Sequence, residues 1–209
     1  TGPSFPIPEA GYNVKNFGKK GIIITFDYVW GKEIAGVFEH FTKEAGGEII
    51  QKVFVPMTTT DFAPYFAKFD KSANYVYDAF FGPPATLIIK QFKEFGLDKQ
   101  FRLTGGVLLM PEVVNPVMDY AEGLTGSVRY LPALDTPENK KFIQAYQQKY
   151  GIGPGLSSAD GYESAIAIRK ALEAIKADIE NKKPEFFDAL AQVKFAGPRG
   201  AFEIDPKYH

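Results

Sequence analysis

Short apolar runs alternate with amphipathic stretches along residues 21–119. Residues 21–26 form a continuous apolar run with three isoleucines, which is typical of a strand buried on both faces of a parallel sheet. In residues 32–45, apolar side chains recur every three or four positions, which predicts a helix with one buried face. Because strands that alternate with helices pair in parallel, we expect an α/β fold with a doubly wound, mostly parallel sheet. The expected strands are residues 21–26, 48–55, 74–80 and 101–104, and the expected helices are residues 32–45, 62–69, 83–95 and 111–119.

The pattern changes after Tyr120. Three consecutive amphipathic helices are predicted there, and they have no strands of their own to cover. We therefore expect part of their sheet to come from chain that this sequence does not contain. Residues 1–16 are rich in Pro, Gly and Asn, have no period, and are predicted to form a loop or arm. The expected elements after Tyr120 are a strand at 124–131, an extended connector at 132–137, helices at 137–150, 158–179 and 184–193, and a hairpin at 194–204.

Composition and charge exclude several classes of function. The chain has 209 residues, of which 45% are hydrophobic and 15% aromatic, as is typical of a globular protein. Its formal net charge is -1 with both signs mixed along the chain, so no basic face for nucleic acid is predicted. It has no cysteine, which excludes thiolate catalysis and cysteine-ligated metal sites. No apolar run approaches the ~20 residues of a membrane span, and the chain does not start with the pattern of a signal peptide.

No group of residues typical of an enzyme is evident. The two histidines, His40 and His209, have no recognisable catalytic or metal-binding partners. The glycines of residues 151–155 lie between two predicted helices, whereas a dinucleotide fingerprint lies between a strand and a helix. Ser158 and Asp160 stand near a helix start without a histidine, so we interpret them as capping residues that could also bind a polar or anionic group. We therefore predict neither an enzyme nor a cofactor or metal site.

The carboxyl ends of the predicted strands carry groups suited to a small ligand. In an open α/β sheet, ligands bind in the crevice beyond these ends. Aromatic residues there offer stacking surfaces for a ligand. Of the adjacent Phe80 and Phe81, one is expected in the core and the other at the ligand. Successive glycines let a ligand approach backbone N–H groups closely. Ordinary packing and turn formation remain alternatives for both features. The candidate ligand-binding residues are Tyr28, Trp30, Phe80, Phe81, Gly82, Thr104, Gly105, Gly106, Ser158 and Asp160.

Five segments together resemble a known family, the type I periplasmic binding proteins that serve as substrate-binding proteins of branched-chain amino-acid-type ABC transporters. Each segment is unspecific alone, whereas their order and spacing between Gly21 and His209 make the resemblance specific. The segments are residues 27–33 (DYVWGKE), 60–65 (TDFAPY), 132–139 (PALDTPEN), 158–162 (SADGY) and 195–200 (FAGPRG).

The resemblance implies two α/β lobes, each with a Rossmann-like sheet, that close on a ligand like a clamshell. Residues 1–20, whose first 16 residues do not match the family, are expected to be an N-terminal arm. By the resemblance, residues 21–122 are a ligand-binding lobe, residues 123–193 a hinge crossover with helices of the other lobe, and residues 194–209 a returning hairpin. The first segment of the family, which forms most of the other lobe's sheet, is expected to be absent. Self-association through the surface left by that segment is a further expectation.

The resemblance also implies a function. We expect a non-catalytic, periplasmic or extracellular receptor that binds a small molecule and delivers it to the membrane permease of an ABC transporter. Amino-acid-binding members hold the ligand ammonium with a carboxylate after the fourth strand, where this chain has Gly105; Asp27 and Asp78 are substitutes, although neither stands at the expected position. Because an unpaired ammonium is costly to bury, we favour an aromatic or apolar carboxylate stacked on Trp30 or Phe80 over a branched-chain amino acid. A ligand-sensing regulatory module of the same fold and an enzyme of the same architecture remain alternatives.

Overall fold

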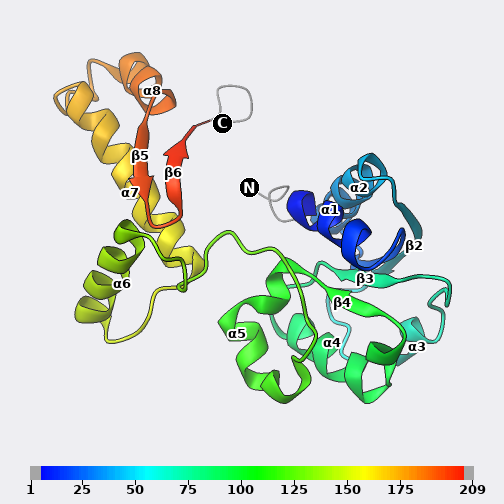
Figure 1. The fold of residues 1–209 in the computed structure, drawn as a ribbon. Coiled ribbons are helices and arrows are strands. Elements are labelled where there is room, and N and C mark those ends of the chain that lie inside the picture. The colour runs from blue at the N-terminus through cyan, green and yellow to red at the C-terminus, as the bar shows by residue number, and fades with distance from the viewer. Residues whose placement is uncertain (1–5, 205–209) are drawn as a thin grey trace. The chain divides into compact units, whose positions relative to one another are not determined.

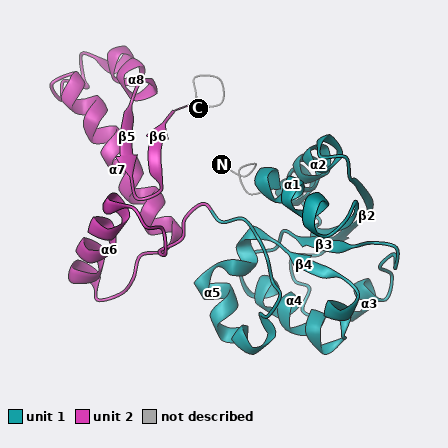
Figure 2. Cartoon of the chain, in the orientation of Figure 1, with its two compact units in different colours: residues 1–128 teal, residues 129–209 magenta. Residues whose placement is uncertain are grey.

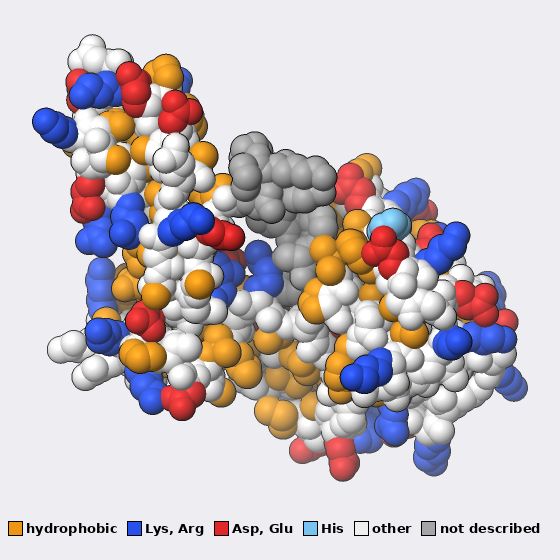
Figure 3. Space-filling model, turned by 45° about the horizontal axis from the view of Figure 1, so that its top comes forward, with side chains coloured by type: hydrophobic (Ala, Val, Ile, Leu, Met, Phe, Trp, Pro, Cys, Tyr) orange, Lys and Arg blue, Asp and Glu red, His pale blue; other side chains and the backbone are white. Residues whose placement is uncertain are grey.

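The computed structural model describes residues 6–204. The chain divides into two compact units, residues 1–128 and residues 129–209 (Figure 2). The outermost parts of the predicted arm and of the predicted return hairpin, residues 1–5 and 205–209 with His209, lie outside the described residues. On the face drawn in Figure 3, positive and negative side chains are interspersed, as expected from a formal net charge of -1.

The first unit contains the predicted parallel sheet. Its strand order is β2-β1-β3-β4 and every neighbouring pair is parallel (Figure 1). The carboxyl ends of the central strands therefore meet at one edge, where Ile24 of β1 pairs with both Val53 of β2 and Asp78 of β3. The strands are β1 (Lys20–Phe26), β2 (Glu48–Val55), β3 (Tyr75–Asp78) and β4 (Arg102–Thr104).

Helices cover both faces of this sheet, which explains the continuous apolar run of β1. Ile23 packs with Phe38 and Tyr77 on the face of α1 and α2, where the two rings stack with centroids 3.7 Å apart. Ile22 and Ile24 point to the opposite face, against residues of α3 and α4. The helices are α1 (Pro6–Asn16), α2 (Val29–Glu44), α3 (Ala63–Phe66), α4 (Pro83–Glu94) and α5 (Pro111–Val114), with 3₁₀ turns η2 (Leu97–Lys99), η3 (Gly106–Leu109) and η4 (Asn115–Tyr120).

Two expectations about secondary structure are wrong. Residues 6–16 form helix α1 and not a loop. The segment has a low helix propensity, but Ala10 and Asn13 are buried, and their packing against the rest of the unit stabilises the helix. Residues 124–131 form no strand; the segment makes a single parallel bridge, between Thr125 and Thr104 at the end of β4.

The second unit consists of three helices and a hairpin. Helix α6 has the predicted bounds and begins after Thr136, whose hydroxyl accepts a hydrogen bond from the Asn139 N–H at 3.1 Å. The predicted hairpin is confirmed as an antiparallel pair, and α7 packs on α8 around Ala171 and Phe186. Among residues 6–204, no helix combines the length and the apolar character needed to cross a membrane. The elements are α6 (Pro137–Tyr150), α7 (Leu156–Ala174), α8 (Lys183–Ala191), β5 (Lys194–Gly197) and β6 (Gly200–Glu203).

Candidate functional site

Three aromatic side chains meet at the carboxyl edge of the sheet, and we call them the aromatic wall: Tyr28 directly before α2, Trp30 in its first turn, and Phe81 in the loop after β3. The Tyr28 and Trp30 rings stack with centroids 6.1 Å apart and an interplanar angle of 27°. Trp30 meets Phe81 edge to face at 5.5 Å. Phe81 is 40% exposed, while Tyr28 and Trp30 are half-buried. The wall therefore combines a fixed geometry with accessible ring surface.

Local backbone chemistry holds the wall in place. A Cβ on Gly31 would lie 2.1 Å from the Phe26 carbonyl oxygen, so only glycine lets the first turn of α2 approach the end of β1 this closely. After β3, Asp78 Oδ1 accepts a hydrogen bond from the Phe80 N–H at 2.7 Å, which fixes the turn. Phe80 is fully buried in the core and Phe81 is exposed, as expected for the pair. Gly82 follows with a φ of 65°, a conformation that favours glycine, and precedes α4.

The segment after β4 is more enclosed than expected. Thr104 is fully buried, and its hydroxyl accepts a hydrogen bond from Asn13 Nδ2 at 2.8 Å. The Gly105 N–H donates to the Thr125 carbonyl oxygen at 3.0 Å, and Gly106 is buried. A Cβ on Gly105 would lie 2.5 Å from the Asp78 carbonyl oxygen, so this glycine is required by the approach of two strand ends. The expectation that the Gly105 N–H is open to a ligand is corrected by this geometry.

The two carboxyl groups considered as ammonium partners differ sharply. Asp78 is 1% exposed, and burial raises its pKa well above the ordinary value, with the nearby Glu9 charge acting in the same direction. Burial therefore disfavours the charged form of the Asp78 carboxyl. Asp27 is exposed and forms an ion pair with Lys32 at 2.8 Å. The sequence reasoning missed Glu9, a third carboxyl, because its segment was interpreted as a loop; this side chain is 2% exposed and its Oε2 accepts a hydrogen bond from the Ser127 N–H at 3.2 Å.

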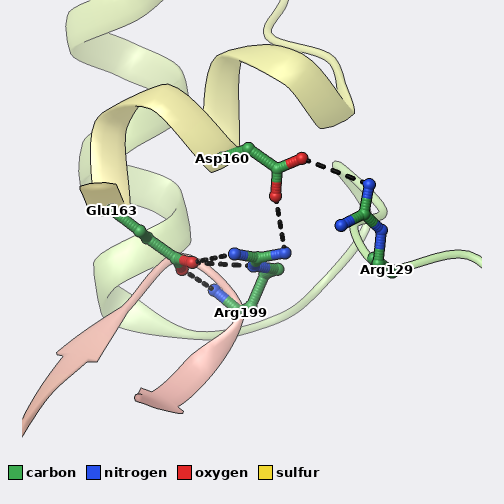
Figure 4. Close-up of polar contacts among 4 residues, drawn as sticks. All are labelled: Arg129, Asp160, Glu163 and Arg199. Carbon is green, nitrogen blue, oxygen red and sulfur yellow. Dashed lines mark hydrogen bonds and ion pairs between the residues drawn. The ribbon is translucent and has the colours of Figure 1, made fainter. Parts of the chain in front are cut away.

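In the second unit, Asp160 takes part in an ion-pair network that the sequence did not reveal (Figure 4). Its Oδ1 accepts a hydrogen bond from Arg199 Nη1 at 2.8 Å, and its Oδ2 lies 3.4 Å from Arg129 Nη2. Arg199 also donates from Nε to the buried Glu163 at 2.7 Å. Both oxygens of Asp160 are thus engaged in holding the hairpin turn and the segment at Arg129 against α7.

Ser158 behaves as the predicted capping residue. Its hydroxyl accepts a hydrogen bond from the Gly155 N–H at 3.4 Å. It also lines a cavity of about 300 Å³ together with Phe142, Tyr146 and Tyr162. Over residues 6–204, no group of three or more His, Asp or Glu side chains is placed to hold a metal ion.

Comparisons with known proteins agree on one family. A family model described as "Periplasmic binding protein" matches residues 8–209. The Leu/Ile/Val-binding protein homolog 6 of Brucella suis is 27% identical over 198 residues, which cover 90% of this chain and 50% of that protein. The chain thus spans about half the length of the curated relatives it matches.

Two solved structures share the fold. An ABC transporter substrate-binding protein from Sphaerobacter thermophilus superposes with a TM-score of 0.89 and 32% identity, covering 96% of this chain and 56% of that one. An ABC transporter solute binding protein from Rhodopseudomonas palustris, in complex with 3,4-dihydroxybenzoic acid, superposes with a TM-score of 0.84 and 28% identity, covering 99% of this chain and 57% of that one.

Proposed function

Because the chain belongs to the periplasmic binding protein family, we propose that it binds a small aromatic or apolar carboxylate, without transforming it, for uptake by an ABC transporter. The membrane permease of that transporter is the proposed partner, and the periplasm or the cell exterior the proposed location. The alternative of a ligand-sensing regulatory module of the same fold gains no specific support from the geometry.

The observation that carries the proposal is the aromatic wall. One exposed ring beside two half-buried rings suits a flat apolar ligand, since aromatic pairs stabilise each other by about 0.5–1.5 kcal/mol beyond the effect of burial. The wall stands at the carboxyl edge of a parallel sheet, which is where ligands of such folds bind.

The start of α2 supports a carboxylate as the polar end of the ligand. Helix α2 begins at Val29, between the wall residues Tyr28 and Trp30, and no side chain caps its N-terminus. Free backbone N–H groups and the positive end of the helix dipole favour an anion there. In the first unit, Asp78 is buried, which disfavours its charged form, and Asp27 is paired with Lys32, so neither is well placed to receive an amino-acid ammonium near the wall.

Titration calorimetry with a set of solutes tests this function. The solutes are benzoate, 4-hydroxybenzoate, 3,4-dihydroxybenzoate, leucine and isoleucine, each titrated into this chain and into the complete product of its reading frame. We expect saturable binding of at least one aromatic acid and weaker binding of both amino acids. Preferential binding of leucine would contradict the ligand class, and no binding by the complete product would contradict the function.

A further inference from the structure

The turn between β3 and α4 places two adjacent phenylalanines in different surroundings. Phe80 is fully buried, while Phe81 is 40% exposed and belongs to the aromatic wall. Phe26 contacts both rings, with centroid distances of 4.7 Å to Phe80 and 5.2 Å to Phe81. Within residues 6–204, neither the N–H nor the carbonyl oxygen of Phe81 takes part in a backbone hydrogen bond. The position of Phe81 in the wall therefore depends on how the preceding residues of the turn are held.

Two buried polar side chains hold this turn. Asp78 Oδ1 accepts a hydrogen bond from the Phe80 N–H at 2.7 Å, and the Thr25 hydroxyl donates to the Ala79 carbonyl oxygen at 3.2 Å. Thr25 is 0% exposed and Asp78 is 1% exposed, so bulk water does not replace either side chain. The backbone directly before Phe81 is therefore fixed by two side-chain groups, one from β1 and one from β3.

The carboxyl group of Asp78 stabilises the turn at a cost. Its second oxygen, Oδ2, is buried and has no hydrogen-bond partner among the described residues, which lowers the stability of the fold. Removal of the side chain would remove this cost, but it would also leave the Phe80 N–H without its acceptor. Because the two effects oppose each other, we expect Asp78 to contribute more to the conformation of the turn than to the free energy of unfolding.

We propose that Asp78 and Thr25 are positioning residues of the ligand site, which hold the turn so that Phe80 lies in the core and Phe81 lies in the aromatic wall. Neither side chain touches the ligand, and both act on its affinity through Phe81. This role rests on the function proposed above, because the affinity concerned is that of the wall for an aromatic carboxylate. It does not depend on the charge of Asp78, since a carboxyl oxygen accepts a hydrogen bond in the ionised and in the protonated form.

Benzoate titrations of variants of the full chain test this role. Asp78→Ala should weaken binding about tenfold, the loss expected when Phe81 leaves the wall. In the Phe81→Ala background the same change should weaken binding less than about twofold, because two residues that act through one contact are not additive. Asp78→Asn keeps an acceptor oxygen and should restore most of the affinity. Asp70→Ala is the matched control, because Asp70 accepts a hydrogen bond from the Ser72 N–H at 2.8 Å in an exposed turn outside the wall, and it should leave the affinity unchanged.

Fluorescence of the ligand-free chain separates this role from the proposed function. Trp30 meets Phe81 at 5.5 Å, so Asp78→Ala should move the Trp30 emission maximum to longer wavelength, as Phe81→Ala does, whereas Asp78→Asn should not. If Asp78→Ala fails to fold, Thr25→Val, which keeps the shape of the side chain and removes the hydroxyl, should give the same shift and a loss of affinity.

The outcomes are distinct. A natural chain that does not bind benzoate would contradict the proposed ligand class, while the Trp30 emission of the variants would still decide the role of the turn. Natural Trp30 emission in both Asp78→Ala and Thr25→Val would overturn the proposal. Additive effects of Asp78→Ala and Phe81→Ala on the affinity, or an Asp78→Asn variant as weak as Asp78→Ala, would overturn it as well.

Discussion

Arg199 binds the buried carboxylate of Glu163, with Nε 2.7 Å from Oε2 and the backbone N–H 3.2 Å from Oε1. The side chain of Glu163 is 1% exposed, so Arg199 takes the place of water as the partner of this carboxylate. The pair joins the turn between β5 and β6 to helix α7 (Figure 4).

Removing the cation should destabilise the second unit. Arg199→Leu leaves the Glu163 carboxylate buried and unpaired, for which a loss of about 3–5 kcal/mol in the free energy of unfolding is expected. Urea denaturation followed by circular dichroism measures it. Arg169→Leu is the matched control, because its ion pair with Glu173 is exposed and should contribute less than about 1 kcal/mol. Equal stability of both variants would show that the buried pair does not support the fold.

Glu9 should make stability depend on pH. Its folded-state pKa of about 7 is raised above the ordinary 4.5, so the folded state holds the proton more tightly. Protonated Glu9 stabilises the folded state relative to the unfolded state, and this contribution is present in full below pH 4.5. It is lost as the pH rises through 7, which lowers the free energy of unfolding by about 3 kcal/mol for Glu9 alone. Burial and the charge of Glu9 also raise the pKa of Asp78 and Tyr77, so Asp78 contributes with the same sign.

Thermal unfolding of Glu9→Gln across this range tests the assignment. The variant should lose most of the decline in stability between pH 4.5 and pH 7, and should be more stable than the natural chain at the upper end. Parallel pH profiles for the variant and the natural chain would mean that Glu9 titrates normally.

The hydrophobic pattern predicted the sheet because the burial of a strand on both faces is visible in a short run of sequence. Residues 21–26 are apolar on both faces, and the structure buries them between α1 and α2 on one side and α3 and α4 on the other. Helix α1 was missed because Ala10 and Asn13 are held by contacts with distant parts of the chain, which no local period reveals. The segment 124–131 was mistaken for a strand because its apolar residues pack in different places: Leu124 packs on the core of the first unit and Tyr130 on a cluster of the second unit, and Thr125 alone bridges to β4.

The candidate site was predictable where it depends on strand ends. Tyr28, Trp30 and Phe81 follow β1 and β3 directly, and their proximity follows from parallel pairing. Other contacts join side chains far apart in the sequence, and the spacing of residues does not predict them. Examples are the hydrogen bond from Ser127 to Glu9 and the ion pairs of Asp160 with Arg129 and Arg199.

Gly105 should tolerate no side chain. In Gly105→Ala, the new Cβ would lie 2.5 Å from the Asp78 carbonyl oxygen, so strand ends must move apart, at a cost of about 1–3 kcal/mol. Gly36→Ala in α2 is the control, because a Cβ there meets nothing within 4 Å and alanine favours a helix by up to about 1 kcal/mol. Chemical denaturation of both variants measures the difference, and a neutral Gly105→Ala would disprove the close approach.

The self-association expected from the sequence has candidate contacts in the second unit. Ile152, Ile168, Ile179 and Phe187 are 44–64% exposed. Because exposed apolar side chains favour association, the weight-average sedimentation coefficient should rise with protein concentration, and Phe187→Glu should reduce the rise. A single monomeric species at micromolar concentration would contradict the expectation.

Fluorescence of Trp30 tests the central claim most directly, because it is the single tryptophan of the chain and belongs to the aromatic wall. We predict that benzoate changes this fluorescence in a saturable way, and that Phe81→Ala weakens the apparent affinity about tenfold, corresponding to the loss of one aromatic contact. Phe95→Ala, which removes an exposed phenylalanine outside the wall, should leave the affinity unchanged. Benzoate binding detected by calorimetry with no change in Trp30 fluorescence and no effect of Phe81→Ala would contradict the account.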